Sequence, residues 1–205
     1  KRLDGGAVLS GSSQQLDALA GDSGVGALSG DELVMGTTSV ATRSTGASQL
    51  FRAFGKTGNF SGLGGRGIGV AIIDSGIASH SDLNNTNAFH VDAYGHGTHV
   101  AGIVAGSGSG SRSGQDSTYV GMAPGAALIS LKVLGADGTG YVSDVIRALD
   151  WTIRNKQRYG IRVVNLSLGH PTSGSYANDP LAKAVERAVA AGLVVVASAG
   201  NFGKL

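Results

Sequence analysis

Short apolar runs alternate with longer amphipathic stretches through most of the chain after residue 60. Four of these runs are rich in Val, Ile and Leu at consecutive positions, which is typical of strands buried on both faces of a parallel sheet. They occupy residues 70–73, 128–133, 163–166 and 193–197. Apolar residues spaced three and four apart predict helices at 100–105, 143–159 and 180–191. The alternation predicts an α/β fold, a parallel sheet with helices on both faces.

The helix at 180–191 has the clearest end signals. Asp179 is a good N-cap, Pro180 suits the first helical position, and Gly192 follows the last periodic residue. The helix at 143–159 is predicted from an apolar face made of Val145, Ile146, Leu149 and Ile153.

The first 34 residues follow a different pattern. Apolar pieces at 7–9 and 25–29 flank a helix-like stretch at 12–20, which predicts a small β-α-β unit too short to fold alone. The polar stretch at 36–46 is expected to be a linker or processing segment, and residues 47–54 a short amphipathic helix. We therefore predict two parts, residues 1–40 and residues 41–205.

Composition narrows the class of protein. The 205 residues are 41% hydrophobic and 15% charged, which is typical of a globular chain. A net charge of +2 and 5% aromatic residues argue against a nucleic-acid partner. No apolar run reaches the roughly 20 residues that cross a bilayer, and no signal peptide is recognisable. The absence of cysteine excludes disulfides, thiolate metal ligands and a cysteine nucleophile.

Candidate chemistry centres on one acid and one histidine. Asp74 ends the strand pattern in V-A-I-I-D-S-G, at the sheet edge where doubly wound folds place their sites. His96 follows 22 residues later, in Y-G-H-G-T-H-V-A-G, at the start of an apolar helix. A carboxylate that accepts the Nδ1 proton would orient the imidazole as a general base. We expect the two side chains to lie within hydrogen-bond reach.

Asp74 and His96 could also serve a different kind of site. His96, His99 and Asp74 could ligate a metal, but the H-E-x-x-H spacing is absent and no other histidine has a ligand spacing to the pair. We therefore expect His99 to be a packed histidine and assign no metal ligand. Residues 62–67 satisfy G-x-G-x-x-G, but they precede the strand instead of following it, which argues against a dinucleotide site.

A third candidate residue lies near the end of the sequence. In V-V-A-S-A-G-N the last predicted strand delivers Asn201 beyond a glycine, at the same sheet edge as Asp74. Asparagine after glycine is commonly a turn residue. Its side-chain amide could also donate a hydrogen bond to a developing oxyanion.

Four motifs in this order, D-S-G, H-G-T-H-V-A-G, N-L-S-L-G and S-A-G-N, resemble those of the subtilisin-like serine peptidases. The resemblance runs from about residue 57 to the last residue. It implies that Asp74 is the triad aspartate, His96 the triad histidine and Asn201 the oxyanion-hole asparagine. It implies a subtilisin-like fold that is incomplete at its C-terminus.

The resemblance extends to substrate binding. Ser167, Leu168 and Gly169 are similar to the family segment that lines the primary specificity pocket and pairs with the substrate backbone. Gly138, Thr139 and Gly140 are similar to the facing segment, so the substrate expected is an extended polypeptide gripped between them. Residues 1 to about 35 resemble the end of a propeptide, which implies the chain's own propeptide as a partner. The resemblance to the family implies an extracellular location.

Two departures from the family pattern are visible. The G-T-S motif of the serine nucleophile does not occur, so we expect that serine beyond residue 205 and expect the 205-residue chain to be inactive alone. Residues 106–119 lack the asparagine-rich loop that holds calcium in well-known members, so calcium is possible in the parent protein but no ligands are assigned. No other cofactor is expected.

The sequence thus predicts a serine endopeptidase that hydrolyses peptide bonds of proteins through an Asp-His-Ser triad. Two alternatives remain open, a catalytically dead relative that captures extended peptides and an α/β domain that binds a small ligand. The parent reading frame beyond residue 205 would distinguish the enzyme from these alternatives, because only the enzyme needs the serine motif.

Overall fold

The computed structural model describes residues 2–3, 6–7, 9–25, 45, 63–110, 119–170 and 175–200. Several predicted features lie outside these residues: the strand at 26–29, the linker at 36–44, the helix at 47–54 and the side chain of Asn201. The chain divides into two compact units, Lys1–Gly36 and Thr37–Leu205, and each is described by itself. Within the described residues, no helix is long and apolar enough to cross a membrane.

The first unit begins with a hairpin where a single strand was expected. β1 (Arg2–Leu3) pairs antiparallel with β2 (Gly6–Ala7), and α1 (Ser13–Ala20) follows. A capping box starts α1, because the Ser12 hydroxyl accepts from the Gln15 N–H while the Gln15 side chain accepts from the Ser12 N–H. Val25, at the start of the predicted second strand, lies in a loop.

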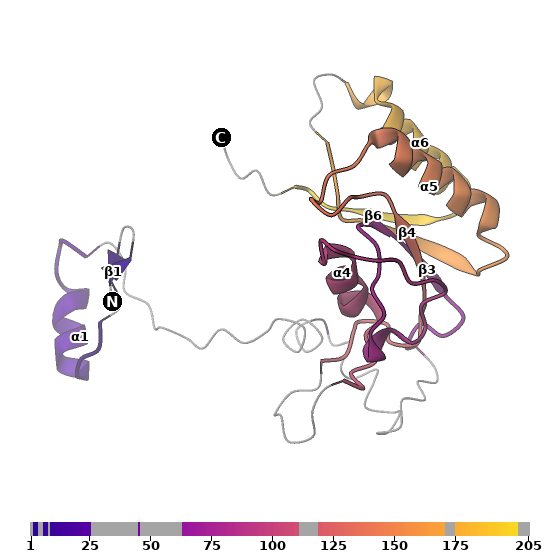
Figure 1. Ribbon diagram of the computed structural model, residues 1–205. Helices are drawn as coiled ribbons and strands as arrows, with labels where there is room; N and C mark the ends of the chain where they lie inside the picture. The colour runs from indigo at the N-terminus through magenta and orange to yellow at the C-terminus, as the bar shows by residue number, and fades with distance from the viewer. Residues whose placement is uncertain are drawn as a thin grey trace. The chain divides into compact units, whose positions relative to one another are not determined.

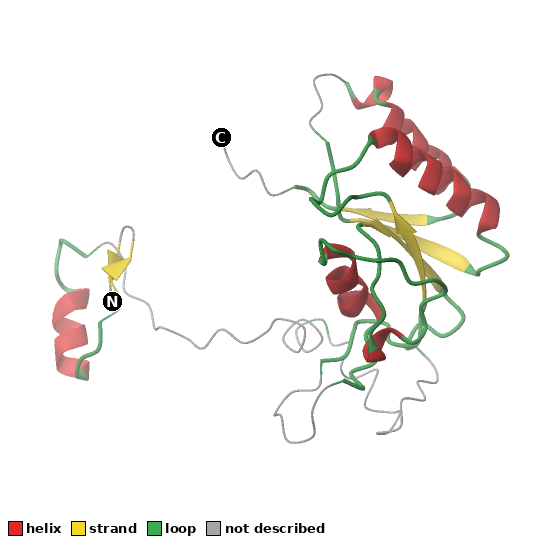
Figure 2. Ribbon diagram, in the orientation of Figure 1, coloured by secondary structure: helices red, strands yellow, loops and turns green. Residues whose placement is uncertain are grey.

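The second unit is built on a four-stranded parallel sheet, as predicted. Its strands are β3 (Gly69–Asp74), β4 (Ala127–Lys132), β5 (Ile161–Leu166) and β6 (Val194–Ala197). They lie in the order β4-β3-β5-β6, with Asp74 opposite Lys132 at the end of the β3–β4 pair. Figure 2 shows the strands as the centre of this unit, with helices against them.

Helices cover both faces of the sheet, again as predicted (Figure 1). α5 (Val142–Asn155) and α6 (Pro180–Ala190) pack on the face that carries Ala71 and Ile73 of β3. α4 (His96–Ala105) packs on the opposite face, through Ala101 and Ala105 against Val70 and Ile72. Because successive β3 side chains point to opposite faces, this one strand contributes to both cores.

The helix ends show where pattern reading succeeds and fails. α6 begins as predicted, with the Asp179 carboxylate accepting from the Ala182 N–H at 2.8 Å. α5 ends at Asn155, four residues before the predicted Tyr159, because residues 156–160 form a turn into β5 in which Gly160 has φ 61°. α4 begins at His96, four residues before the predicted start.

β6 contradicts the prediction of a strand buried on both faces. Val194 is 60% exposed and Val196 is 51% exposed, and β6 is the outermost strand of the described sheet. β-branched residues at consecutive positions do favour a strand, but they do not show whether another element covers its second face.

The connections between the strands distinguish β3 from the other strands of the sheet. The chain passes from β3 to its neighbour β4 through α4, which lies on one face of the sheet. It then passes from β4 to β5, the neighbour of β3 on the other side, through α5, which lies on the opposite face. The strand order therefore reverses at β3. In parallel α/β sheets, ligands bind outside the carboxyl end of the strands at such a point, and Asp74 occupies that end of β3.

Candidate active site

Asp74 is the buried acid of the site. Its side chain is fully buried, and its Oδ1 atom accepts hydrogen bonds from the Ser75 N–H at 2.7 Å and the Ser75 hydroxyl at 3.2 Å. Its backbone carbonyl accepts from the Val133 N–H at 2.8 Å, which ties the end of β3 to the end of β4. Burying a carboxylate is costly unless it has hydrogen-bond partners, and the N–H and hydroxyl of Ser75 supply two of them.

His96 is the main partner of that carboxylate. Its Nδ1 atom lies 2.8 Å from Oδ1 and 2.9 Å from Oδ2 of Asp74, which is the close approach expected from the sequence. The His96 side chain is 40% exposed, so one side of the ring faces the carboxylate and the other is open. With Nδ1 donating its proton to Asp74, the lone pair of Nε2 is available as a base.

A glycine permits this approach. A Cβ atom on Gly97 would lie 2.2 Å from the Gly76 carbonyl oxygen and 3.1 Å from the Asp74 Cβ. Only a residue without a side chain can bring the first turn of α4 so close to the end of β3. The Gly97 N–H donates to the Ser75 hydroxyl at 2.9 Å, and that hydroxyl in turn donates to Asp74.

One cavity of about 510 Å³ collects the predicted substrate-binding residues around His96. The loop after β4 contributes one predicted segment and the loop after β5 the other; they are Gly138, Thr139, Gly140, Ser167, Leu168 and Gly169. Both segments follow the carboxyl ends of strands that flank β3, which explains why distant parts of the sequence meet here. Asp74 lies beneath His96 and does not line the cavity.

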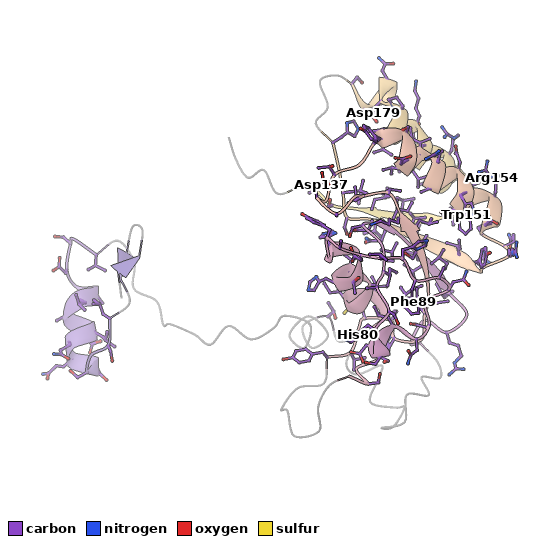
Figure 3. All side chains as sticks on the ribbon, in the orientation of Figure 1. His80, Phe89, Asp137, Trp151, Arg154 and Asp179 are labelled. Atoms are coloured by element: carbon purple, nitrogen blue, oxygen red, sulfur yellow. The ribbon has the colours of Figure 1, made fainter. Side chains whose placement is uncertain are left out.

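The loop after β4 is held by its own hydrogen bonds. Asp137 accepts from the Thr139 N–H at 3.0 Å and from the Thr139 hydroxyl at 2.8 Å, and the Gly135 N–H donates to the Thr139 carbonyl at 2.7 Å. The backbone and hydroxyl donors of Thr139 hold the pKa of Asp137 below its ordinary value. Figure 3 shows Asp137 and Asp179, which follow β4 and β5, at one end of the sheet, and Arg154 at the other end.

The structure adds cavity residues that the sequence did not single out. Tyr94 lies beside the histidine, its ring centroid 6.2 Å from that of His96, and a Cβ on Gly138 would lie 2.4 Å from the Tyr94 ring. The signal was present, because Tyr94 opens the histidine motif. The other added residues are Leu134, Tyr141, Val142, Val145, His170 and Leu181.

Among the described residues, no hydrogen bond joins another histidine side chain to the Asp74–His96 pair, although His170 lines the same cavity as His96. His99 is exposed, so the prediction of a packed histidine is wrong: the apolar face of α4 does not extend to its position. His80 Nδ1 accepts from the Asp82 N–H at 3.1 Å, and His170 Nε2 lies 3.1 Å from an Asp179 oxygen. The described residues contain no group of three His, Asp or Glu side chains placed to hold a metal ion.

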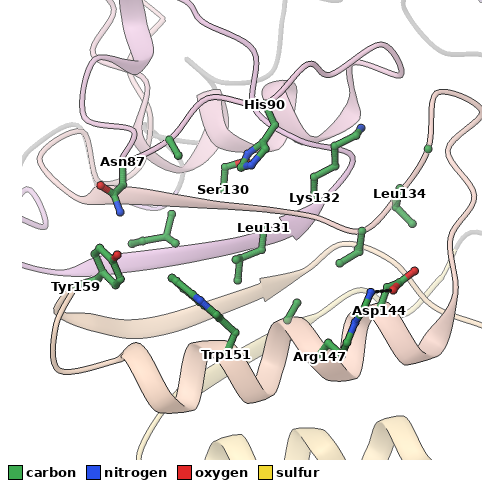
Figure 4. Close-up of a pocket in the computed structure, with 15 residues that line it drawn as sticks. Asn87, His90, Ser130, Leu131, Lys132, Leu134, Asp144, Arg147, Trp151 and Tyr159 are labelled. Atoms are coloured by element: carbon green, nitrogen blue, oxygen red, sulfur yellow. Dashed lines mark hydrogen bonds and ion pairs between the residues drawn. The ribbon is translucent and has the colours of Figure 1, made fainter.

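A second cavity, of about 830 Å³, lies between the outer edge of β4 and α5 (Figure 4). Trp151 and Tyr159 stack at one end with ring centroids 5.5 Å apart, and the His90 ring contacts the Ser130 hydroxyl at 3.0 Å. Its volume exceeds that of the cavity at His96. It contains neither Asp74 nor His96, so the chemistry argued from the sequence does not belong to it.

Comparison with known proteins identifies the family to which the chain belongs. The sequence profile of the subtilase family, peptidase S8, matches residues 65–204. The chain belongs to the subtilase family. Subtilisin BL of Lederbergia lenta is 41% identical over 150 residues, which are 69% of this subtilase and 51% of the relative. Serine protease AprX of Bacillus subtilis (strain 168) is 38% identical over 178 residues, 80% of this chain and 38% of that one.

Solved structures show the same fold. A cold-adapted subtilisin-like serine proteinase matches this subtilase with a TM-score of 0.55 and 30% identity, over 70% of this chain and 50% of that chain. Sphericase matches with a TM-score of 0.60 and 32% identity, over 78% and 53%. The subtilase chain thus spans between 38% and 53% of the length of these relatives. The predicted subtilisin-like α/β fold is confirmed.

Proposed function

We propose that residues 37–205 carry the acid and base of a serine endopeptidase that hydrolyses peptide bonds through an Asp-His-Ser triad. The observation that carries this proposal is the contact of His96 Nδ1 with both oxygens of the buried Asp74, at 2.8 and 2.9 Å. Membership of the subtilase family supports it. A serine beyond residue 205 of the complete protein supplies the nucleophile.

The residues act in a fixed sequence. His96 Nε2 takes the proton of the serine hydroxyl as the oxygen attacks the substrate carbonyl carbon, and the protonated ring is stabilised by the Asp74 carboxylate. The same proton then passes from Nε2 to the leaving amine, which frees the new N-terminus. Water then attacks the acyl-enzyme and gives a proton to Nε2, and that proton passes to the serine oxygen as the acid product is released.

Asn201 is proposed as the donor to the oxyanion of the tetrahedral intermediate. The preceding strand, β6, runs parallel to β5 and ends at Ala197, so the chain leaves the sheet at the edge that carries Asp74. In subtilisin, itself a member of this family, loss of one such donor lowers kcat by about 10²–10³. Asn201 should therefore accelerate the reaction without being indispensable.

The proposed substrate is an extended polypeptide that lies between two loops of the cavity. Gly138–Gly140 and Ser167–Gly169 line the same cavity as His96, and an extended peptide would lie between them as an added strand. We further propose that the first unit is the end of the enzyme's own propeptide and that the protein acts outside the cell. Both follow from the family and not from a contact between the units.

Peptide hydrolysis by the complete protein, the form that extends past residue 205, tests the proposal. His96→Ala should lower kcat by about 10⁶, the loss seen when a subtilisin triad histidine is removed. His99→Ala is the matched control, because it removes an exposed histidine one turn further along α4 and should change kcat less than threefold. The 205-residue chain should show no turnover.

Two results would overturn the proposal. If the complete protein binds an extended peptide with unchanged affinity in both histidine variants and hydrolyses nothing, it is a peptide-binding relative and not an enzyme. If the purified 205-residue chain itself turns over peptide, the nucleophile does not lie beyond residue 205.

A further inference from the structure

The helix that carries His96 has no side-chain cap of its own. Its N-cap is Gly95, which has φ 85° and no polar side chain, yet the backbone N–H groups of a first helical turn need acceptors. Asp92, three residues upstream, supplies them. Its Oδ1 accepts from the Gly95 N–H at 2.9 Å, and its Oδ2 accepts from the Thr98 N–H at 2.8 Å and the Thr98 hydroxyl at 2.5 Å.

The same carboxylate is connected to the strand that carries Asp74. The Thr98 hydroxyl, which donates to Asp92, accepts from the Ala78 N–H at 2.9 Å, in the loop just after β3. On the other side of His96, the Ser75 hydroxyl accepts from the Gly97 N–H at 2.9 Å and donates to Asp74 at 3.2 Å. The backbone on both sides of His96 is thus fixed relative to the acid.

We propose that Asp92 is a positioning residue of the active site, which holds the first turn of α4 so that His96 Nδ1 points at Asp74. The proposal rests on the proposed role of His96 as the general base. Asp92 itself does not line the cavity at His96. Asp92 acts through Thr98 and Gly95. These two residues flank the histidine in the sequence, and their N–H groups donate directly to the Asp92 carboxylate.

Charge is part of this arrangement. A carboxylate offers acceptors to three donors, whereas an asparagine in its place offers one oxygen and turns an NH₂ group toward the N–H and O–H groups of Gly95 and Thr98. An anion near the first turn also interacts favourably with the positive end of the helix dipole. Partial burial acts to raise the pKa of Asp92, but the hydroxyls of Thr98 and Ser75 and the N–H groups of Thr98 and Gly95 outweigh it, so the pKa lies below its ordinary value of 3.8.

The Nδ1 proton of His96, observed by NMR in the 205-residue chain, tests the proposal without requiring peptidase activity. In the wild-type chain we expect a far-downfield resonance that exchanges slowly with water, because the proton lies between Nδ1 and a buried carboxylate. Asp92→Asn and Thr98→Val should each speed its exchange at least tenfold. Thr98→Ser, which keeps the hydroxyl, should restore the wild-type rate.

Asp179→Ala is the matched control, since it removes a helix-capping carboxylate from α6, a helix that does not carry His96. It should lower stability without changing the Nδ1 exchange rate. If Asp92→Asn melts cooperatively like the wild type and keeps a slowly exchanging Nδ1 proton, the positioning role is refuted. The positioning role is also refuted if Asp179→Ala changes the Nδ1 exchange rate as much as Asp92→Asn does. A wild-type chain with no Nδ1 signal would instead contradict the Asp74–His96 pair itself.

Discussion

At the residue scale, the groups around His96 define the chemistry that its imidazole can perform. A histidine between glycines is ambiguous, but one whose Nδ1 lies 2.8 Å from a fully buried aspartate has a fixed tautomer and a defined open nitrogen. The residues that create this geometry are short and polar. Ser75, Asp92 and Thr98 fix the backbone, and Gly97 allows it to come close.

The lowered pKa of Asp92 predicts how stability depends on acid. Its pKa in the folded chain lies below the ordinary 3.8 of an unfolded chain, so the stabilisation from its hydrogen bonds is complete well above pH 3.8 and is lost as the pH falls through the lowered value. The free energy of unfolding of the wild type should exceed that of Asp92→Asn by a constant amount from about pH 7 to pH 5. Below that range the difference should shrink.

Urea unfolding at several pH values measures this difference. Thr98→Val is the control within the same contact: in the Asp92→Asn background it should cost less than in the wild type, because the hydrogen bond between the two residues is already lost. A difference that stays constant or grows on acidification would contradict the assignment.

Sequence alone indicated Asp74 and His96, because one ends a buried strand and the other opens a helix at the same sheet edge. It did not indicate Asp92 or Ser75 as partners. Their roles depend on tertiary hydrogen bonds across 6 and 22 residues, which leave no periodic signal. His99 was placed wrongly, since its position on the exposed side of α4 follows from how the helix packs on the sheet.

At the scale of elements, α4 shows how tertiary contacts extend a helix past its own sequence preference. The apolar spacing begins at Val100, and a turn containing Gly95 and Gly97 has low helix propensity. The helix nevertheless starts at His96, since Asp92 and Ser75 accept from its first N–H groups. The four strands of the parallel sheet needed no such help, because the predicted apolar runs end within two residues of the observed strand ends.

Two glycines of α4 provide a paired test of the close approach. Gly97→Ala would place a Cβ 2.2 Å from the Gly76 carbonyl oxygen, so we expect it to destabilise the chain by about 1–3 kcal/mol, a typical cost of overpacking. Gly102→Ala meets no atom within 4 Å and should stabilise by up to about 1 kcal/mol, through helix propensity. Urea unfolding of both variants measures the two changes; effects of the same sign and size would contradict the packing described.

At the scale of the whole molecule, the strands in the sheet of the second unit are unequally buried. β3 is buried throughout, while β6 exposes Val194 and Val196. Apolar runs gave the α/β class and the strands, but they could not show that β6 would be outermost, because that depends on which elements lie beyond it. Two exposed valines at i and i+2 on one face form an apolar surface.

This apolar surface should bind a hydrophobic dye in the 205-residue chain. Val194→Thr combined with Val196→Thr keeps two β-branched residues in the strand and should reduce dye fluorescence by more than half. Val189→Thr is the control, because Val189 is 54% exposed on α6 and lies outside the strand. Equal fluorescence in the double variant and the wild type would show that β6 is covered.

The central claim, that Asp74 and His96 activate a serine, is tested most directly by labelling the complete protein with a serine-directed phosphonate. Mass spectrometry should find one adduct on a serine beyond residue 205, formed rapidly in the wild type. Asp74→Asn should slow labelling by about 10⁴, since an asparagine would hold the wrong tautomer of His96, and His96→Ala should abolish it. Labelling at the wild-type rate in either variant would contradict the account.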